Sequence, residues 1–290
     1  MEWYIYAFGA ALFASIAALL NKKVLQHEHA LEFTASRNVL ILILSLGLVP
    51  FVNLVMPWYI YLALLFISIL VFSGMLFYMK SIRHGEISTV APMMNISPLF
   101  LLILAFLILK EVPTGKQYFG VFLLIIGAYS LQVGIADKGF IEPIRAFLKT
   151  KAIHNMIFAI AIFSLTATLD KLIISKYMDW VTYLFLMILF KTIISVALES
   201  YRNGYREIIK DIKQDFKLMS ASSISIFTTD ILYMLAVSSK TSMISLIIPI
   251  KRTATLFTTI FGGTLFHERN LLVKILSCII MIWGAIFILL

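Results

Sequence analysis

Residues 87–111 read ISTVAPMMNISPLFLLILAFLILKE, and residues 244–268 read ISLIIPIKRTATLFTTIFGGTLFHE. The two stretches share Ile-Ser, a proline, Leu-Phe, an isoleucine and a final glutamate at the same offsets. A Gly-Ala pair follows each stretch at the same distance, at residues 127–128 and 284–285. The chain is therefore interpreted as a duplication, in which each copy lies in a run too apolar for contact with water.

The composition places the whole chain in a membrane. Apolar residues make up 61% of the 290 residues and charged residues only 13%, whereas charged residues approach a quarter of a soluble domain. Apolar runs of about 18 residues or more are typical of transmembrane helices, because lipid offers no partner for backbone polar groups. Ten such runs are predicted, at residues 3–21, 31–52, 57–79, 87–109, 117–135, 153–174, 180–199, 218–239, 242–266 and 271–290.

Ten helices divide into two sets of five, which we assign to residues 1–136 and 137–290. An odd number of helices in each set makes the second copy enter the membrane from the opposite side, as in the inverted repeats of secondary transporters. The first helices also match, with Leu20-Asn21-Lys22 against Leu169-Asp170-Lys171. The predicted fold class is an all-α integral membrane protein with ten transmembrane helices in two inverted five-helix repeats.

The loop charges predict an orientation in the membrane. Loops after the odd-numbered helices hold 14 lysines and arginines, and the other loops hold four. The positive-inside rule then places the odd-numbered loops in the cytoplasm and both termini outside. The longest of these connections, residues 201–217, has apolar side chains spaced among charges, which is typical of either an amphipathic helix on the membrane surface or a solvated basic loop.

Several residues predict helix geometry. Pro92, Pro98 and Pro249 fall inside apolar runs, where proline removes a hydrogen bond and kinks the helix. Small residues favour close helix packing in lipid, so we interpret four of them as packing positions: Gly120, Gly127, Ser277 and Gly284.

Ionisable residues deep in a membrane are costly and are candidates for function. Four of them lie near the middle of predicted helices: Lys191, Asp230, Lys251 and Arg252. Asp170 and Lys171 lie near the end of theirs, and Arg37 is close enough to a helix end to reach the headgroups. The charges are interpreted either as buried struts that neutralise one another or as the lining of a polar cavity.

In the cavity interpretation, the four central charges sum to +2 and favour a substrate with a carboxylate or phosphate. A zwitterion also fits, with Asp230 holding its amine. Asp230 and Asp170 are the candidate proton carriers, while Tyr233 and Asn95 are candidates for neutral substrate contacts.

Other functional classes find little support in the residues. The five histidines show no metal-ligand spacing, and the sequence contains no Walker A, G-x-S-x-G or H-E-x-x-H pattern. We therefore expect no enzyme activity, no metal, no cofactor and no nucleic-acid partner. Cys278 is the one cysteine, so a disulfide within the chain is impossible.

The motif Ser97-Pro98-Leu99-Phe100, followed by Leu109-Lys110-Glu111, resembles the EamA-type repeat of the drug/metabolite transporter superfamily. The second copy, ending in Phe266-His267-Glu268, is similar. The resemblance implies ten helices around a central cavity, alternating access without ATP, and a structural role for Glu111 and Glu268. It also implies cytoplasmic termini, in conflict with the loop charges.

The leading hypothesis is a secondary transporter or exporter of a small polar metabolite, anionic or zwitterionic. The alternatives are an exporter of drugs or lipophilic cations and, from another class, a membrane-embedded enzyme acting on lipid-linked phosphates. The expected partners are the small-molecule substrate and the lipid bilayer. The sequence does not determine the oligomeric state, and a monomer is compatible with it. The expected location is a multi-pass position in a membrane, the cytoplasmic (inner) membrane in a prokaryote.

Overall fold

The computed structural model describes residues 2–24, 30–84, 91–133, 151–254, 257 and 271–290, and within them the secondary structure is helical, with no strand. The first half contains α1 (Trp3–Val24), α2 (Ala30–Ser45), η1 (Leu46–Phe51), α3 (Trp58–His84), η2 (Ala91–Ile96), α5 (Ser97–Leu104), η3 (Ala105–Leu109) and α6 (Gly115–Val133). The second half contains α8 (Lys151–Lys176), α9 (Trp180–Arg202), α10 (Tyr205–Gln214), α11 (Phe216–Ser238), α12 (Ile244–Lys251) and α14 (Leu271–Leu289).

The all-helical, multi-pass character predicted from the sequence is confirmed. Among the described residues, six helical spans are long and apolar enough to cross a membrane: Trp3–Asn21, Leu31–Phe51, Trp58–Tyr78, Lys151–Lys176, Trp180–Arg202 and Phe216–Ser238. Two shorter apolar helical spans are Met94–Leu109 and Leu276–Leu289. Parts of the predicted runs at 87–109 and 242–266 lie outside the described residues, so the count of ten transmembrane helices remains a prediction.

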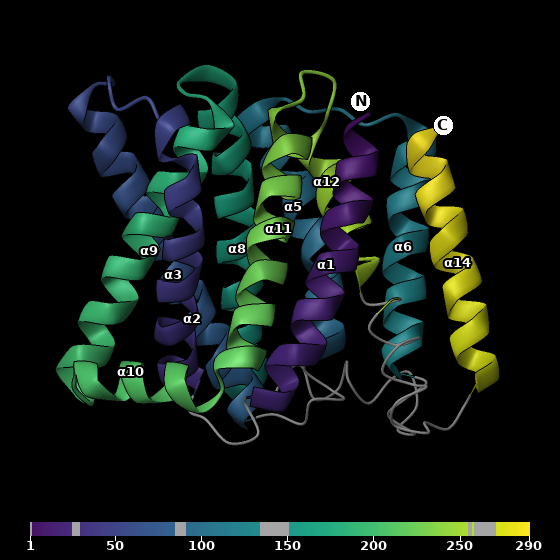
Figure 1. Cartoon of the computed structure of the whole chain (residues 1–290). Helices are drawn as coiled ribbons and strands as arrows, with labels where there is room; N and C mark the ends of the chain where they lie inside the picture. The colour runs from purple at the N-terminus through teal and green to yellow at the C-terminus, as the bar shows by residue number, and fades with distance from the viewer. Residues whose placement is uncertain (1, 25–29, 85–90, 134–150, 255–256, 258–270) are drawn as a thin grey trace.

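Most of the helices stand side by side, with both chain termini at one end of the bundle and α10 lying across the other end (Figure 1). The principal contacts join helices from different halves: α1 with α11, α3 with α8, α2 with α9, and α6 with α14. Smaller contacts join α1 with α12 and α5 with α8. The interior is thus built between the halves.

The predicted packing positions lie where α6 and α14 approach closely. A Cβ atom on Gly120 would lie 2.7 Å from the carbonyl oxygen of Gly284, and one on Gly284 would lie 2.8 Å from that of Gly120. A Cβ atom on Gly127 would lie 2.9 Å from the carbonyl oxygen of Ser277. Because these neighbours are backbone atoms, glycine is required for this close approach of the two helices.

The three prolines affect the backbone only near their own positions. Pro98 occupies the first turn of α5, where a missing N–H costs little, and Pro92 lies in η2. Over residues 91–109 the fourth predicted helix changes type along its length, from the 3-10 turn η2 through the α-helix α5 to the π-helical turn η3. Pro249 lies inside α12, and the N–H of Arg252 is shared between the carbonyls of Ile248 and Pro249, at 3.0 and 3.1 Å. The backbone tightens at the level of Lys251 and Arg252.

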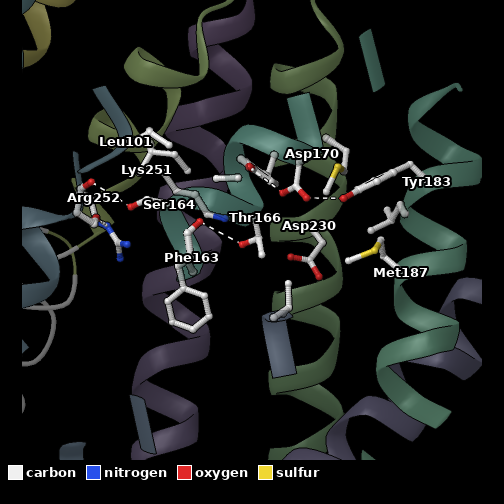
Figure 2. A pocket seen from close by; sticks show the side chains of 18 of the residues that line it. Leu101, Phe163, Ser164, Thr166, Asp170, Tyr183, Met187, Asp230, Lys251 and Arg252 are labelled. Atoms are coloured by element: carbon white, nitrogen blue, oxygen red, sulfur yellow. Dashed lines mark hydrogen bonds between the residues drawn. The ribbon is translucent and has the colours of Figure 1, made fainter. Parts of the chain in front are cut away.

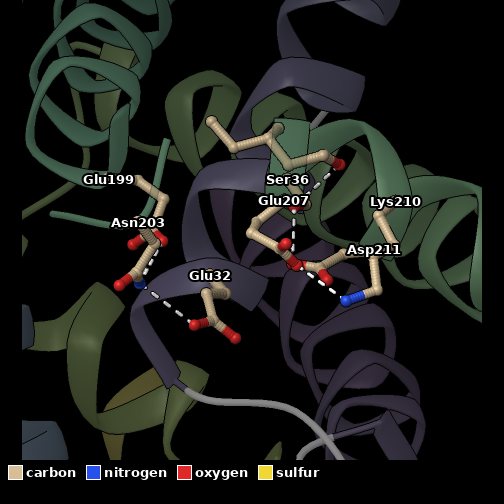
Figure 3. Close-up of polar contacts among 8 residues, drawn as sticks. Glu32, Ser36, Glu199, Asn203, Glu207, Lys210 and Asp211 are labelled. Atoms are coloured by element: carbon tan, nitrogen blue, oxygen red, sulfur yellow. Dashed lines mark hydrogen bonds and ion pairs between the residues drawn. The ribbon is translucent and has the colours of Figure 1, made fainter. Parts of the chain in front are cut away.

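Between the two interpretations of residues 201–217, the helix is correct for Tyr205–Gln214. Its inner side is fixed to α2, because the Ser36 hydroxyl lies 3.4 Å from the Ile208 carbonyl and 3.5 Å from the Asp211 carboxylate (Figure 3). Ile208 is buried, and Ile212 packs against a small core that includes Phe33.

Asp211 should make the stability of the contact between α10 and α2 depend on pH. Burial raises the pKa of Asp211, and the neighbouring Glu32 and Glu207 raise it further. A raised folded-state pKa means that the folded protein is stabilised by the protonated form, and this stabilisation is lost as pH rises from the unfolded-state pKa through the folded-state pKa. We therefore expect Asp211→Asn to unfold at a higher temperature than wild type at pH 8, and at the same temperature below about pH 4.

Thermal unfolding in detergent at both pH values measures this effect. Asp215→Asn, at the end of the same helix, is the matched control and should show a smaller difference. A wild-type protein that is as stable as Asp211→Asn at pH 8 contradicts the prediction.

Candidate functional site

A cavity of about 320 Å³ lies between α8, α9, α11 and α12, with α1, α3 and α5 contributing apolar and serine side chains. Its charged lining comes from the second half of the chain: Asp170, Lys191, Asp230, Lys251 and Arg252. Tyr183 and Tyr233 add hydroxyl groups. Six of the seven residues named from the sequence as binding or proton-carrying candidates are thus brought together.

Helical spacing explains how these side chains share one space. On α9, Tyr183, Met187 and Lys191 are four residues apart and lie on one face. The start of that helix is fixed by Asp179, whose carboxylate accepts hydrogen bonds from the N–H of Thr182 at 2.9 Å and from its hydroxyl at 2.7 Å. This N-cap stabilises the first turn of α9, which carries Tyr183.

The Asp170 carboxylate is held by two tyrosines from neighbouring helices. It accepts a short hydrogen bond from the Tyr183 hydroxyl on α9 and one of 3.2 Å from the Tyr233 hydroxyl on α11. Figure 2 shows Asp170 and Tyr183 pointing toward each other. Tyr183 is fully buried, and no sequence pattern distinguished it from other tyrosines in apolar runs. The three residues join α8, α9 and α11 at one side of the cavity.

Tyr233 also supports a cation. The Lys251 ammonium lies over its ring, 4.1 Å from the centroid, within the range of a cation–π interaction. Tyr233 therefore connects Asp170, through its hydroxyl, with Lys251, through its ring.

Arg252 reaches toward the first half. Its Nε atom donates a hydrogen bond of 3.1 Å to the Ser97 hydroxyl on α5. The carbonyl of Ser97 in turn accepts a bond of 3.3 Å from Ser164 on α8. In Figure 2 Arg252 lies at one side of the labelled group and Tyr183 and Met187 at the other, with Asp230 between them. The cations come from two helices, with Lys191 on α9 and Lys251 and Arg252 at the end of α12.

Lys191 and Lys251 do not make the direct ion pairs that would be the simplest form of the strut interpretation. Across the described ranges, no carboxylate oxygen lies within ion-pair distance of the Lys191 or Lys251 ammonium, and the Asp230 carboxylate accepts no hydrogen bond. The charge sum also needs correction. Because Asp170 joins the lining, three cations face two carboxylates and the sum is 3 − 2 = +1 rather than +2.

Asn95 lies outside the main cavity. It is buried, its side-chain nitrogen lies 3.5 Å from the Ala128 carbonyl, and it borders a neighbouring void of about 10 Å³ that Arg252 also lines. A space of that size holds at most one water molecule. Asn95 is thus adjacent to the site but separated from its open part.

Lys171, next to Asp170, has a different environment. Its ammonium donates to the carbonyls of Val237 and Ser239 at 2.7 and 2.8 Å and to the Ser242 hydroxyl at 2.8 Å. All three donors of the ammonium are used to hold the end of α11 and the following turn. Lys171 is structural.

The Nε atom of Arg37 is buried and has no hydrogen-bond partner among the described residues, and the guanidinium lies 5.2 Å from the centroid of the Phe33 ring. Arg37 is absent from the lining of the main cavity.

Glu111 has the structural role that the sequence resemblance implied. Its two carboxylate oxygens accept hydrogen bonds from the N–H groups of Ile244 and Ser245, at 2.9 and 3.0 Å, and from the Ser245 hydroxyl at 2.6 Å. These groups form the N-terminus of α12, so a residue of the first half caps the helix that carries Lys251. Glu268, its counterpart in the repeat, lies outside the described residues.

The comparisons with known proteins agree with this architecture. Residues 1–132 match the model of the EamA-like transporter family, which confirms the resemblance for that part of the chain. A curated protein of Synechocystis sp., described as an uncharacterized transporter, is 28% identical over 126 residues. That alignment covers 41% of this chain and only 36% of the relative.

A solved crystal structure superposes with a TM-score of 0.72, covering 98% of this chain and 95% of its own, at 14% sequence identity. At that identity the likeness shows the fold alone.

Proposed function

Because residues 1–132 carry the EamA-like transporter match, we propose that the whole chain is a secondary transporter or exporter that works by alternating access. Its substrate is a small polar metabolite, anionic or zwitterionic, bound between two inverted five-helix repeats, residues 1–136 and 137–290. The observation that carries the proposal is the cavity in which Lys191 and Lys251 lack a carboxylate partner among the described residues.

The helix contacts support the inverted repeat. Exchanging the halves turns the α1–α11 contact into α8–α3, and the α1–α12 contact into α8–α5, and all four are observed. The α2–α9 and α6–α14 contacts are each exchanged with themselves. This is the pattern expected of two halves related by a two-fold axis in the membrane plane.

The charges of the lining support the substrate class. Three cations against two carboxylates favour an anionic group, for which Arg252 supplies a forked donor and the lysines supply point charges. Between the two candidate proton carriers, Asp170 accepts hydrogen bonds from two tyrosines, whereas none of the described residues donates a hydrogen bond to Asp230. Asp230 is therefore the better candidate both for holding the amine of a zwitterion and for carrying a proton.

The alternatives fit less well. A carrier of lipophilic cations needs an excess of acid over base in its cavity, and the charge sum has the opposite sign. An enzyme acting on lipid-linked phosphates would also use buried cations, but the family match over residues 1–132 favours transport.

The test is a substrate panel in proteoliposomes. Purified protein is reconstituted and loaded with mixed metabolites, and exchange is followed for carboxylates, phosphates, zwitterions, neutral polar compounds and lipophilic cations, with protein-free liposomes as the control. We expect exchange of one of the first three classes, with no requirement for ATP. Transport of lipophilic cations alone would replace the proposal with the drug-export alternative.

A further inference from the structure

The surface formed by residues 201–217, at the end of the bundle opposite the termini (Figure 1), is unused by the proposed transport cycle. We propose that the outward face of this segment binds the anionic headgroups of the surrounding phospholipid leaflet.

The inward face of the segment is firmly attached to the bundle. Besides the contacts of Ser36 with α10, the Asn203 side-chain amide donates to Glu199 at 2.6 Å and to Glu32 at 3.1 Å (Figure 3). Glu199 is fully buried and belongs to α9, whereas Glu32 belongs to α2. The segment is thus held on two helices, and its outward face has a defined direction.

The outward face combines cations with apolar side chains. Five cations on it are exposed: Arg202, Arg206, Lys210, Lys213 and Lys217. Two partly buried acids, Glu207 and Asp215, leave a net charge of 5 − 2 = +3, and Glu207 pairs with Lys210 at 2.9 Å. Between the cations stand exposed apolar and aromatic residues: Tyr201 (89% exposed), Tyr205, Ile209 and Phe216.

A phospholipid leaflet satisfies both kinds of side chain at once. Aromatic and aliphatic groups insert at the headgroup level, and lysine and arginine at the same depth attract acidic headgroups. The leaflet surrounds the transmembrane helices and therefore always lies beside this end of the bundle.

The opposite end differs in composition. Its connections contain only four lysines, which are exposed and separated along the chain: Lys110, Lys116, Lys176 and Lys240. The cationic face therefore also gives the molecule a direction. It places α10 against the leaflet that is richer in anionic lipid and the termini on the other side, the orientation indicated by the loop charges, which include these five cations, and opposite to the one that the family resemblance implies.

The test compares two triple variants with equal loss of charge. Arg206→Gln/Lys213→Gln/Lys217→Gln removes cations of the outward face, and Lys116→Gln/Lys176→Gln/Lys240→Gln removes cations of the opposite end. Each full-length protein is reconstituted in mixed phosphatidylglycerol and phosphatidylcholine, extracted in mild detergent, and the co-purified lipids are quantified by mass spectrometry. This readout needs no transport substrate, so its failure and that of the proposed function are independent.

We expect the wild-type protein to enrich phosphatidylglycerol, and the enrichment to fall by about fivefold for each cation removed from the outward face. Raising the salt to about 1 M should also abolish it, since the screening length is then about 3 Å. The opposite-end variant should retain wild-type enrichment. Equal enrichment in wild type and the outward-face variant, or equal loss in both variants, would overturn the proposal; circular dichroism and gel filtration establish that all three proteins are folded.

Discussion

Replacing Lys251 and Arg252 together with methionine should reduce the substrate kcat/KM by about 100-fold or more. Each cation lost from an anion site removes a charge-assisted hydrogen bond of about 1.5–3 kcal/mol, and two such losses correspond to at least two orders of magnitude. The change also reverses the cavity charge from +1 to 1 − 2 = −1, so that an anionic substrate is repelled. Initial rates of uptake in proteoliposomes, over a range of substrate concentrations, measure the effect.

The same variant separates a binding role from a structural role. Among the described residues, no carboxylate lies within ion-pair distance of the Lys251 ammonium, so removing this charge relieves its desolvation, and we expect the folded variant to be about as stable as wild type. If the two cations were struts, the variant would instead unfold more easily while the folded fraction transported normally. Lys176→Met/Lys240→Met, which removes two exposed cations, is the control and should leave KM unchanged. A folded Lys251→Met/Arg252→Met protein with wild-type KM would refute the anion-site assignment.

Most of the charged lining could be predicted, because a charged residue within an apolar stretch can be recognised from the sequence alone. Four charged residues were identified in this way, and all four line one cavity: Lys191, Asp230, Lys251 and Arg252. Tyr183 could not be found in this way, since its role depends on facing Asp170 from another helix. The partners of a helix residue across a helix–helix contact depend on the rotation of both helices, which sequence spacing alone does not determine.

The sequence-based predictions that needed correction also depended on side-chain directions that sequence spacing does not determine. Asp170 and Lys171 are adjacent, yet one faces the cavity and the other caps α11, because successive helix residues point about 100° apart. The charge sum of +2 omitted Asp170 because it counts only the four charges near the middle of predicted helices, and Asp170 lies near the end of its helix. Asn95 stands at the repeat position of Arg252, and the two border one small void, but Arg252 alone extends into the cavity.

Substitution of Glu111, which caps the N-terminus of α12, should have the second large effect, on both stability and transport. Glu111→Ala removes three acceptor contacts and leaves the N–H groups of Ile244 and Ser245 without partners in an apolar setting. Unsatisfied buried donors cost about 1–3 kcal/mol each, so we expect a loss of about 3 kcal/mol in the free energy of unfolding. Glu111→Gln keeps one acceptor oxygen and should lose about 1 kcal/mol. Denaturant-induced unfolding in detergent measures both values.

Transport should fall further in Glu111→Ala than the folded fraction explains, because Lys251 is the last residue of the helix that Glu111 caps. A loosened N-terminus lets α12 shift around Pro249, which moves the Lys251 ammonium from its place over the Tyr233 ring. Glu2→Ala, which changes an exposed glutamate, is the control for both measurements. If Glu111→Ala is as stable as Glu111→Gln, the hydrogen bonds to α12 contribute little. If transport then falls only in proportion to folded protein, Glu111 serves stability alone and the position of Lys251 does not depend on the cap.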